Sequence, residues 1–299
     1  MARPLFIGVD GGATFCRARI RDLDGNLLGE GGAGPANIHS NPGLARESIQ
    51  QACDAALQSS GLDGRSLEWA HVGLGLAGAG IKSACDQLLS EVFPFASMML
   101  ETDAYVAWLG AHQGDDGGIV ILGTGSCGLA MISGQRTGVA GWGSQVSDEA
   151  GGQRVGREAL RRTLWAFDGR AHQTELSTAI LDRFGWDPAR IVSFASKAAP
   201  SDYAELAPLV FRYASVQDAL AVTLVREAAE AAVRIIDRLV DVGAPAISLV
   251  GGLAEPLTPW LPPRIRELLR EPKADPLDGG ILMARRAFFK VDSVLLRAG

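Results

Sequence analysis

Short apolar runs and tight turns alternate at the start of the chain. Residues 5–9 form an apolar run, and residues 14–20 alternate apolar and polar side chains with the period of a half-buried strand. Asp24-Gly25-Asn26 is a hairpin turn signal, and the apolar pair Leu27-Leu28 follows it. The pattern therefore predicts a meander of three strands.

Helical periodicity begins after this meander. Asn41-Pro42 places a cap residue and an N1 proline before a helical stripe made of Ile49, Ala52, Cys53, Ala56 and Leu57. Further along, the pattern predicts strands at 69–76 and 97–100 and helices at 81–92 and 104–112. Alternating strands and helices indicate an α/β fold.

The opening pattern then returns. An apolar strand at 117–122 leads into the glycine turn Gly123-Thr124-Gly125-Ser126 and a second strand at 127–132. The strand–glycine turn–strand unit of residues 5–20 thus recurs at 118–132, which indicates an internal duplication.

The duplication predicts two domains, residues 1–114 and residues 115–299, joined by a hinge near 114–118. The second domain is mostly helical, and the helix that closes the chain is expected to pack back on the first domain. Its predicted helices lie at 152–166, 174–184, 203–213, 217–241 and 277–289, with one strand at 246–250.

Composition narrows the class of protein. The net charge of −6 argues against a nucleic-acid binder, because a phosphate backbone requires a basic face. No apolar run is long enough for a membrane span or a signal-peptide core, so a cytoplasmic protein is expected. The four cysteines and four histidines are scattered, so neither a disulfide framework nor a zinc site is expected.

Two glycine turns are candidates for phosphate binding. Asp10-Gly11-Gly12-Ala13-Thr14 offers backbone N–H groups without Cβ obstruction, a carboxylate for Mg²⁺, held directly or through water, and a hydroxyl for a phosphate oxygen. Gly123-Thr124-Gly125-Ser126 offers two glycines and two hydroxyls. Each motif alone is also typical of an ordinary β-turn. Two such turns in duplicated hairpins predict a clamp for a triphosphate that differs from the P-loop.

Three other segments carry candidate chemistry. Asp103 lies where a strand ends and a helix begins, so it suits both an N-cap and a carboxylate that accepts a proton. The segment 141–152 concentrates polar residues between glycines, which suits either a polyol-binding loop or a cap for the next helix. Gly251-Gly252 suits either the packing of a flat base or the simple end of a strand.

These elements in this order resemble the N-acetylglucosamine and bacterial glucosamine kinases of the BadF/BadG-type ATPase grouping. The resemblance covers nearly the whole chain and is most specific in residues 5–155. It implies a two-domain actin-like ATPase fold of the ribonuclease H-like class, with duplicated β-hairpin units and an interdomain cleft. ATP and Mg²⁺ are the implied cofactors, and a homodimer is the implied assembly.

The resemblance also implies roles for individual residues. Asp103 corresponds to the catalytic aspartate and Asp10 to the residue that organises the metal. Nucleotide contacts are implied for Gly11, Gly12, Thr14, Gly123, Thr124, Gly125, Ser126, Gly251 and Gly252, and sugar contacts for Asn37, Gly78, Gly143 and Asp148. Ala13 departs from the pattern, because the family usually has a third glycine there.

The implied activity is transfer of the γ-phosphate of ATP to an amino sugar. Short stretches such as Thr102-Asp103-Ala104-Tyr105 resemble the glucosamine enzymes in particular, so glucosamine is expected and N-acetylglucosamine is the alternative. A sugar-independent actin-like ATPase is the alternative from another class. An activator ATPase with an iron–sulfur cluster is disfavoured by the scattered cysteines, and a sugar-sensing repressor by a first strand that begins near Leu5.

Overall fold

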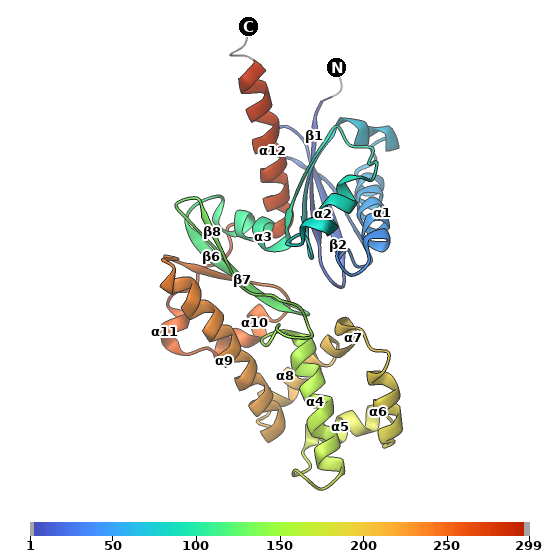
Figure 1. Cartoon of the computed structure of the whole chain (residues 1–299), viewed down its shortest axis with the longest axis vertical. Helices are drawn as coiled ribbons and strands as arrows, with labels where there is room; N and C mark the ends of the chain where they lie inside the picture. Colours follow the sequence, from blue (N-terminus) through green and yellow to red (C-terminus); the bar gives the residue numbers. More distant parts are fainter. Residues whose placement is uncertain (1–2, 296–299) are drawn as a thin grey trace. The chain divides into compact units, whose positions relative to one another are not determined.

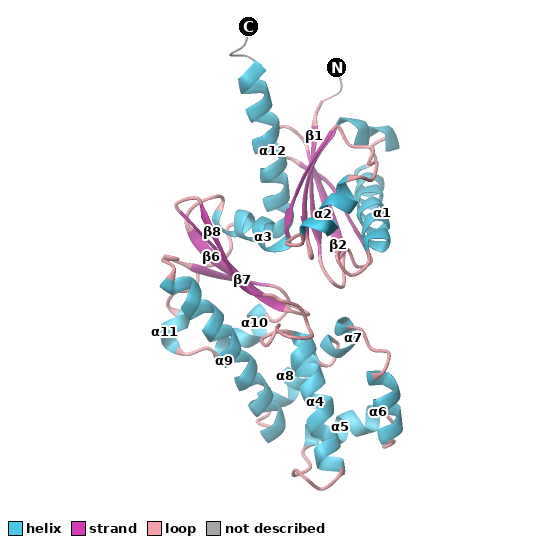
Figure 2. Ribbon diagram, in the orientation of Figure 1, coloured by secondary structure: helices cyan, strands magenta, loops and turns pink. Residues whose placement is uncertain are grey.

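The structure is a computed structural model that describes the backbone of residues 3–295. It divides into two compact units, one formed by residues 1–116 with 271–299 and the other by residues 117–270. We call these units 1 and 2 and describe each by itself (Figures 1 and 2).

Unit 1 is built on a five-stranded mixed sheet with the order β3-β2-β1-β4-β5. The first three strands form an antiparallel meander, whereas β4 and β5 run parallel to β1. The strands are β1 (Leu5–Gly11), β2 (Cys16–Arg21), β3 (Leu27–Ala33), β4 (Ala70–Leu76) and β5 (Ser97–Thr102). The predicted opening meander is confirmed.

Helices cover both faces of this sheet (Figure 1). On one face lie α1 (Pro42–Ser60) and α2 (Lys82–Leu89), with the short 3₁₀ helix η1 (Gly64–Trp69) before β4. Asn41 caps α1 through a hydrogen bond from the backbone N–H of Leu44, as its position before a proline predicts. The other face carries α3 (Asp103–His112) and α12 (Pro276–Leu295).

The α12 backbone packs directly on the sheet because glycines leave room for it. A Cβ added at Gly8 would lie 1.9 Å from the carbonyl oxygen of Leu277, and one added at Gly73 would lie 2.0 Å from that of Gly280. Any side chain at these positions would push the helix off the sheet. The C-terminal helix therefore belongs structurally to the N-terminal strands.

Unit 2 repeats the plan with a four-stranded sheet of order β8-β7-β6-β9. Again a three-stranded antiparallel meander has a parallel strand beside its first strand. The strands are β6 (Gly117–Leu122), β7 (Ser126–Ile132), β8 (Gln135–Ala140) and β9 (Ile247–Val250). The prediction of duplicated hairpin units in an α/β fold is confirmed.

The helices of unit 2 enclose a separate core. The longest, α9 (Ala219–Asp241), buries a stripe of ten residues that includes Leu224 and Ile235. The others are α4 (Gly152–Phe167), α5 (Glu175–Arg183), α6 (Pro188–Ala195), α7 (Pro200–Ala204), α8 (Ala207–Ser215), α10 (Ala254–Leu257), η2 (Thr258–Trp260) and α11 (Pro263–Arg266). Over the described residues, no helix combines the length and apolar character of a membrane span.

Unit 2 differs from the prediction in one divided helix, in strand β8 and in the short helices α6, α10 and α11, which were not predicted. The single helix expected at 203–213 is divided into α7 and α8, because Pro208 lies in the first turn of α8 and has no N–H to continue the preceding helix. Strand β8 was not predicted at all. Its sequence, Gln-Arg-Thr-Gly-Val-Ala, shows little apolar alternation because β8 is an edge strand.

Candidate active site

The parallel strands of unit 1 end at one edge of the sheet. Gly11 of β1 pairs with Leu76 of β4, and Leu76 pairs with Thr102 of β5, so the three carboxyl ends lie in one row. The loops that follow such a row form the usual binding crevice of α/β sheets. Asp103 follows the row directly, and Asp10 lies one residue before it.

The first glycine turn joins β1 to β2 at this edge. Its closing hydrogen bond runs from the N–H of Gly12 to the carbonyl oxygen of Phe15, at 2.8 Å. This N–H was predicted to be open to phosphate, but in the structure it already has a partner. Neither Gly12 nor Ala13 has a positive φ. Alanine in place of the family's third glycine therefore causes no left-handed strain.

Packing requires glycine at only one of the two glycine positions of this turn. A Cβ at Gly11 would lie 2.5 Å from Leu76 Cδ2 and 2.9 Å from the Ala36 Cβ, so packing requires glycine there. A Cβ at Gly12 would meet only the carbonyl oxygen of Phe15, at an ordinary 3.6 Å. Neither packing nor φ requires glycine at position 12, so the open space beside it is available to a ligand.

Asp10 has an arginine partner that the sequence analysis missed. Arg17 lies directly opposite Asp10 in the β1–β2 ladder, and its Nη2 is 2.6 Å from Asp10 Oδ2. Burial raises the pKa of the Asp10 carboxyl, although the hydrogen bond and the charge of Arg17 act in the opposite direction. The Asp10 side chain is 19% exposed, so it is partly rather than fully buried.

Mg²⁺ fits this donor set. Among the described residues there is no group of three His, Cys, Asp or Glu side chains that would hold a metal ion by themselves. Mg²⁺ at nucleotide sites is usually held by one or two carboxylates together with water and substrate phosphates. A single, partly buried carboxylate beside an open glycine turn is compatible with that mode.

Asn37 and Gly78, both predicted to contact a sugar, lie together at the same edge. Asn37 Oδ1 accepts hydrogen bonds from the N–H groups of His39 and Ser40, at 3.0 and 3.1 Å, which fixes the amide orientation. Gly78 has a φ of +86°, and a Cβ there would lie 2.8 Å from Asn37 Oδ1. A sugar contact by Asn37 therefore falls to its Nδ2 group.

Backbone hydrogen bonds join this pair to the glycine turn. The N–H groups of Ala36 and Ala77 donate to the carbonyl oxygens of Gly12 and Gly11, at 2.9 and 2.7 Å. The predicted phosphate-side and sugar-side residues of unit 1 therefore form one continuous framework.

Asp103 is not the N-cap that the sequence predicts. Thr102 caps α3, and its Oγ1 accepts a hydrogen bond from the N–H of Tyr105 at 3.1 Å. Asp103 is the first helical residue, and its Oδ1 accepts from the N–H of Ala104 at 2.9 Å. The carboxylate still benefits from the positive end of α3, so its position suits an acceptor of protons at the sheet edge.

The second glycine turn, in unit 2, is held by the start of α4. The N–H groups of Gly152 and Gln153 donate to the carbonyl oxygens of Gly123 and Thr124, at 2.8 and 3.0 Å. These N–H groups belong to the first turn of α4 and have no partner within the helix. The carbonyl oxygens of the turn thus serve as partners for the first N–H groups of the helix.

The Ser126 hydroxyl, for which a phosphate contact was predicted, is buried beside the second glycine turn. Ser126 is only 3% exposed, and its Oγ accepts a hydrogen bond from the N–H of Ala150 at 3.1 Å. This hydroxyl connects the glycine turn to the loop of residues 141–151, which we call the sugar loop after the sugar contacts that the family resemblance implies for it.

Asp148 lies against the same glycine turn. A Cβ at Gly125 would be 2.7 Å from Asp148 Oδ2, so glycine is required there for the carboxylate to approach. Burial raises the pKa of Asp148; a backbone hydrogen bond from Ser126 lowers it, and the charge of Glu149 raises it further. Glu149 is exposed, with the Ser147 hydroxyl 3.4 Å from its Oε2. Gly143, on the same loop, has a φ of +96°.

Gly251 and Gly252 follow β9, the strand beside β6. A Cβ at Gly251 would lie 2.5 Å from the carbonyl oxygen of Leu122 and 3.3 Å from the backbone nitrogen of Gly123. Nothing lies within 4 Å of a Cβ position at Gly252. The predicted adenosine segment therefore adjoins the second glycine turn and leaves open space beside one glycine.

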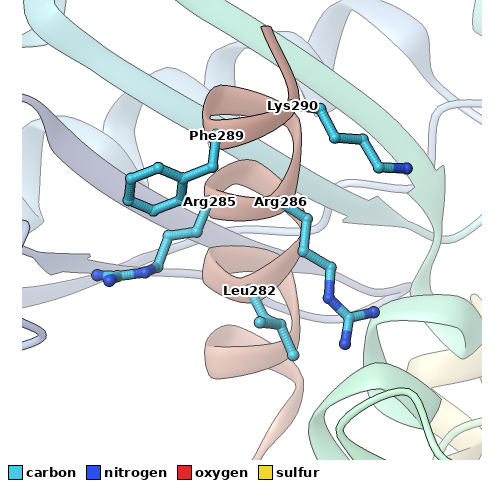
Figure 3. Close-up of a pocket in the computed structure, with 5 residues that line it drawn as sticks. All are labelled: Leu282, Arg285, Arg286, Phe289 and Lys290. Atoms are coloured by element: carbon cyan, nitrogen blue, oxygen red, sulfur yellow. The ribbon is translucent and has the colours of Figure 1, made fainter. Parts of the chain in front are cut away.

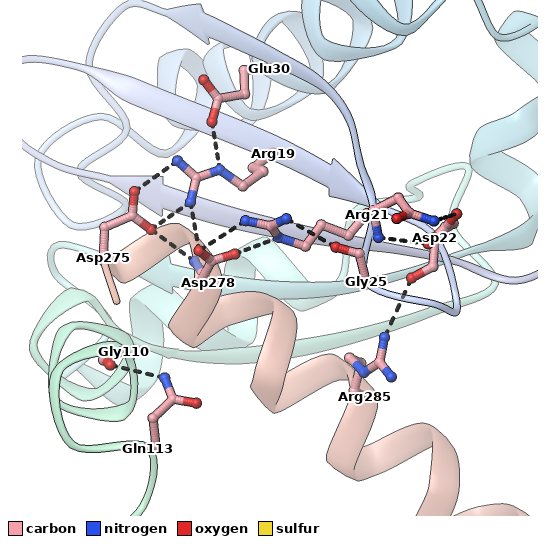
Figure 4. A network of polar contacts seen from close by, with 11 residues as sticks. Arg19, Arg21, Asp22, Gly25, Glu30, Gly110, Gln113, Asp275, Asp278 and Arg285 are labelled. Carbon is pink, nitrogen blue, oxygen red and sulfur yellow. Dashed lines mark hydrogen bonds and ion pairs between the residues drawn. The ribbon is translucent and has the colours of Figure 1, made fainter. Parts of the chain in front are cut away.

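A charge network near the first glycine turn was also missed (Figure 4). Arg19 of β2 binds Asp275 through two hydrogen bonds of 2.8 Å and Asp278 through one of 2.9 Å. Arg21 binds Asp278 at 2.7 Å. Asp275 and Asp278 lie at the start of α12, so these pairs fix the helix to the strand that follows the turn. Arginines at alternate positions of residues 17–21 were the available signal.

A separate hollow in unit 1 lies along α12 (Figure 3). Its lining residues all come from this helix and include none of the predicted site residues: Leu282, Arg285, Arg286, Phe289 and Lys290. Their spacing of three and four residues places them along one side of α12, so the hollow is a shallow surface feature of this helix. It is not the candidate active site.

The two sheets define the fold class of the actin-like ATPases, which includes sugar kinases. A ROK family glucokinase from Streptomyces griseus, solved with glucose and AMPPNP, shares this fold, with a TM-score of 0.57, 20% identity and coverage of 94% of this chain and 98% of that chain. Within this class, the chain belongs to the BadF/BadG/BcrA/BcrD ATPase family, whose model matches residues 7–284. The family resemblance stated from the motifs is confirmed.

Two relatives are more similar. The glucosamine kinase GspK of Vibrio cholerae is 37% identical over 279 residues, which cover 93% of this chain and 95% of that protein. A Chromobacterium violaceum crystal structure, provisionally described as an N-acetylglucosamine kinase, has a TM-score of 0.88 and 35% identity over 94% of this chain and 99% of that chain.

Proposed function

We propose that this protein is an ATP-dependent amino-sugar kinase that converts D-glucosamine to glucosamine 6-phosphate. The observation that carries the proposal is the sheet edge of unit 1. This edge brings together a partly buried carboxylate (Asp10), an open glycine turn (Gly12), the amide of Asn37 and a second carboxylate (Asp103). The similarity to a glucosamine kinase over nearly the whole chain supports the same activity.

Each of the site residues has a proposed role in phosphoryl transfer. Asp103 accepts the proton of the sugar 6-hydroxyl as its oxygen bonds to the γ-phosphorus of ATP, and the bond from that phosphorus to the bridging oxygen breaks to release ADP. The proposed phosphate contacts are Thr14 in unit 1 and Gly123, Thr124 and Gly125 in unit 2, and the proposed part of Gly12 is to leave space for phosphate beside its Cα. Gly251 and Gly252 accommodate the adenosine. Asn37, Gly78, Gly143 and Asp148 orient the sugar.

Asp10 is the proposed carboxylate for Mg²⁺, directly or through water. The ion supplies charge neutralisation at the phosphates when bound. The positive charge of Arg17 stabilises the Asp10 carboxylate, because burying a carboxylate without a partner costs free energy.

The choice between the two amino sugars rests on the sugar loop. Glucosamine carries an ammonium group at neutral pH, which a carboxylate stabilises. Asp148 and Glu149 supply two carboxylates in this loop, so we place glucosamine first and N-acetylglucosamine second. A homodimer, implied by the family resemblance, remains a prediction that sedimentation velocity tests.

The proposal is tested by ADP release with ATP and Mg²⁺ over a panel of sugars. The panel contains glucosamine, N-acetylglucosamine, N-acetylmannosamine, glucose and a control without sugar. We expect turnover that depends on an amino sugar, fastest with glucosamine. ADP release at the same rate in every tube would instead place the protein among the sugar-independent ATPases.

Glucosamine affinity is expected to fall as the pH is lowered, because Asp148 binds the ammonium only when ionised. The raised pKa of Asp148 means that this loss begins at higher pH than for an ordinary aspartate. The measurement is calorimetric titration from about pH 6.5 to about pH 4.5, where the sugar remains protonated. Glu149→Gln removes a charge that raises this pKa, so its profile should move to lower pH. A flat wild-type profile contradicts the role of Asp148.

Gly12→Ala is expected to weaken ATP binding roughly tenfold without weakening the fold. The added methyl group enters the space assigned to phosphate but meets only Phe15 O, at 3.6 Å. Gly64→Ala is the matched control, because nothing lies within 4 Å of its Cβ position in η1. ATP affinity by calorimetry and the free energy of unfolding in urea separate the two effects. Equal ATP affinity in both variants rules out phosphate beside Gly12.

A further inference from the structure

The sheet of unit 1 has an open edge along β5. Strand β5 pairs only with β4, in a continuous parallel register. Apart from this ladder, no backbone hydrogen bond of residues 97–100 reaches another part of the chain that the structure describes. About half of the N–H and C=O groups of an edge strand point outwards, so β5 offers a row of these groups to a further strand.

Strand β5 lacks the features that usually protect an edge. Its sequence, Ser-Met-Met-Leu-Glu-Thr, contains no proline, lysine or arginine. At the opposite edge of the sheet, β3 contains three glycines, and its ladder with β2 has a register shift. A regular edge strand with a single charged residue is suited to pairing with another strand.

Exposed apolar side chains surround this edge. Val92, in the loop before β5, is 84% exposed, the largest value for a large apolar side chain among the described residues. Met99, in the middle of β5, is 42% exposed, and Trp69 is 54% exposed. The N–H of Ala96 donates to the carbonyl oxygen of Ala70 at 3.0 Å, which places Trp69 beside the start of β5. Apolar groups gathered at an open edge mark an interaction surface.

Polar groups lie on one face of the same edge. Ser97, Met99 and Glu101 alternate along β5, so their side chains share one face of the sheet. His71 is the β4 partner of Ser97, and its Nδ1 is 2.7 Å from Ser97 Oγ. A hydroxyl group can accept one hydrogen bond and donate another. Ser97 can therefore connect His71 to an acceptor beyond the edge.

A second copy of the chain supplies such an acceptor. We propose that two copies pair through this edge, with their β5 strands antiparallel and Met99 opposite Met99. Because residues 97 and 101 are equally far from 99, this two-fold arrangement brings Glu101 of the second copy opposite Ser97. Its carboxylate accepts a hydrogen bond from the Ser97 hydroxyl, in a polar row that continues to His71. The two Glu101 side chains lie at opposite ends of the pair, so like charges do not meet.

The same arrangement covers the apolar side chains. In an antiparallel pair, the start of one strand lies beside the end of the other. The loop that carries Val92 therefore lies beside Thr102 of the second copy, and the contact is made twice by symmetry. A strand of an unrelated protein would need its own carboxylate and apolar loop at matching positions, whereas a second copy has both. This inference does not depend on the proposed kinase activity.

A cross-link at the two-fold axis tests the register. Opposed residues of an antiparallel pair have Cα atoms about 4.5–5.5 Å apart, within reach of a disulfide. We expect Met99→Cys to form a disulfide-linked dimer under mild oxidation. Met98→Cys is the matched control, because its two copies would be offset along the strands, with Cα atoms about 8 Å apart and beyond reach. The oxidised wild type controls for the four native cysteines.

Met99→Lys tests the surface itself by sedimentation velocity. We expect the wild type to sediment as a dimer and this variant to raise the dimer dissociation constant roughly 100-fold or more, because two lysines would face each other. Val216→Lys, which replaces a 65% exposed apolar side chain of unit 2, should leave the dimer intact. Unfolding in urea confirms that both lysine variants are folded, and if Met99→Lys is not, the cross-link decides.

Three results would overturn the inference. A wild type that sediments as a monomer shows that the edge does not pair. A dimer that folded Met99→Lys leaves intact shows that the copies meet at another surface. Cross-linking that is absent in Met99→Cys, or equally strong in Met98→Cys, excludes the two-fold axis at residue 99.

Discussion

Asp103→Asn is expected to lower kcat by about 10²–10⁴-fold and to leave ATP affinity nearly unchanged. The amide keeps the size of the side chain at the start of α3 but cannot accept the proton of the sugar hydroxyl. Nucleotide affinity is retained because the proposed nucleotide contacts come from other loops. Single-turnover sugar phosphorylation and ATP calorimetry measure the two quantities separately.

Thr102→Ala is the matched control for this experiment. It removes the hydroxyl that caps α3, which should cost about 1 kcal/mol of stability, but it leaves the Asp103 carboxylate in place. We expect a lower free energy of unfolding with kcat close to the wild-type value. Undiminished turnover in Asp103→Asn removes this residue from the mechanism.

Gly73→Ala is expected to lower the free energy of unfolding by about 3 kcal/mol or more. The new Cβ would lie 2.0 Å from the carbonyl oxygen of Gly280, and the obstructing atoms are backbone, so no rotation of a side chain relieves the contact. Helix α12 must move away from β4, which also disturbs the helix start that Arg19 fixes beside the first glycine turn.

Gly138→Ala is the comparison, because this strand glycine of β8 has nothing within 4 Å of its Cβ position. Its unfolding in urea should differ from wild type by about 0.5 kcal/mol or less. If Gly73→Ala proves equally mild, the close packing of α12 on the sheet is not a feature of the protein in solution.

Periodicity and turn chemistry predicted most of the fold. The meander of residues 5–33, the cap at Asn41 and the recurrence of the hairpin unit are local patterns, so they can be recognised without tertiary information. Strand β8 could not be found in this way, because the residues of an edge strand are not required to alternate. The division between α7 and α8 could have been predicted from Pro208.

The candidate site was predicted at the level of loops rather than atoms. The sequence placed Asp10 and Asp103 at strand ends, and the pairing of parallel strands explains why these two share one edge. Asn37 and Gly78 came from the family resemblance alone. The sequence could not show that Thr102, one residue before Asp103, is the cap.

The features of the site that the sequence did not predict are hydrogen bonds between segments that are distant in the chain. The Ser126 hydroxyl is occupied by Ala150, and the Asp10 carboxylate by Arg17 across the ladder. The Ser126 pairing has no signature in a single sequence, and the alternating arginines of residues 17–21 indicate a charged face but not the partner of each arginine.

The central claim is that the phosphoryl group goes to the sugar and not to water. The most direct measurement incubates the protein with ATP, Mg²⁺ and glucosamine and quantifies ADP and sugar phosphate in the same samples, with ³¹P NMR to locate the phosphate. We predict equal amounts of the two products throughout, with the phosphate on the 6-oxygen. ADP that accumulates with inorganic phosphate and without sugar phosphate would contradict the account.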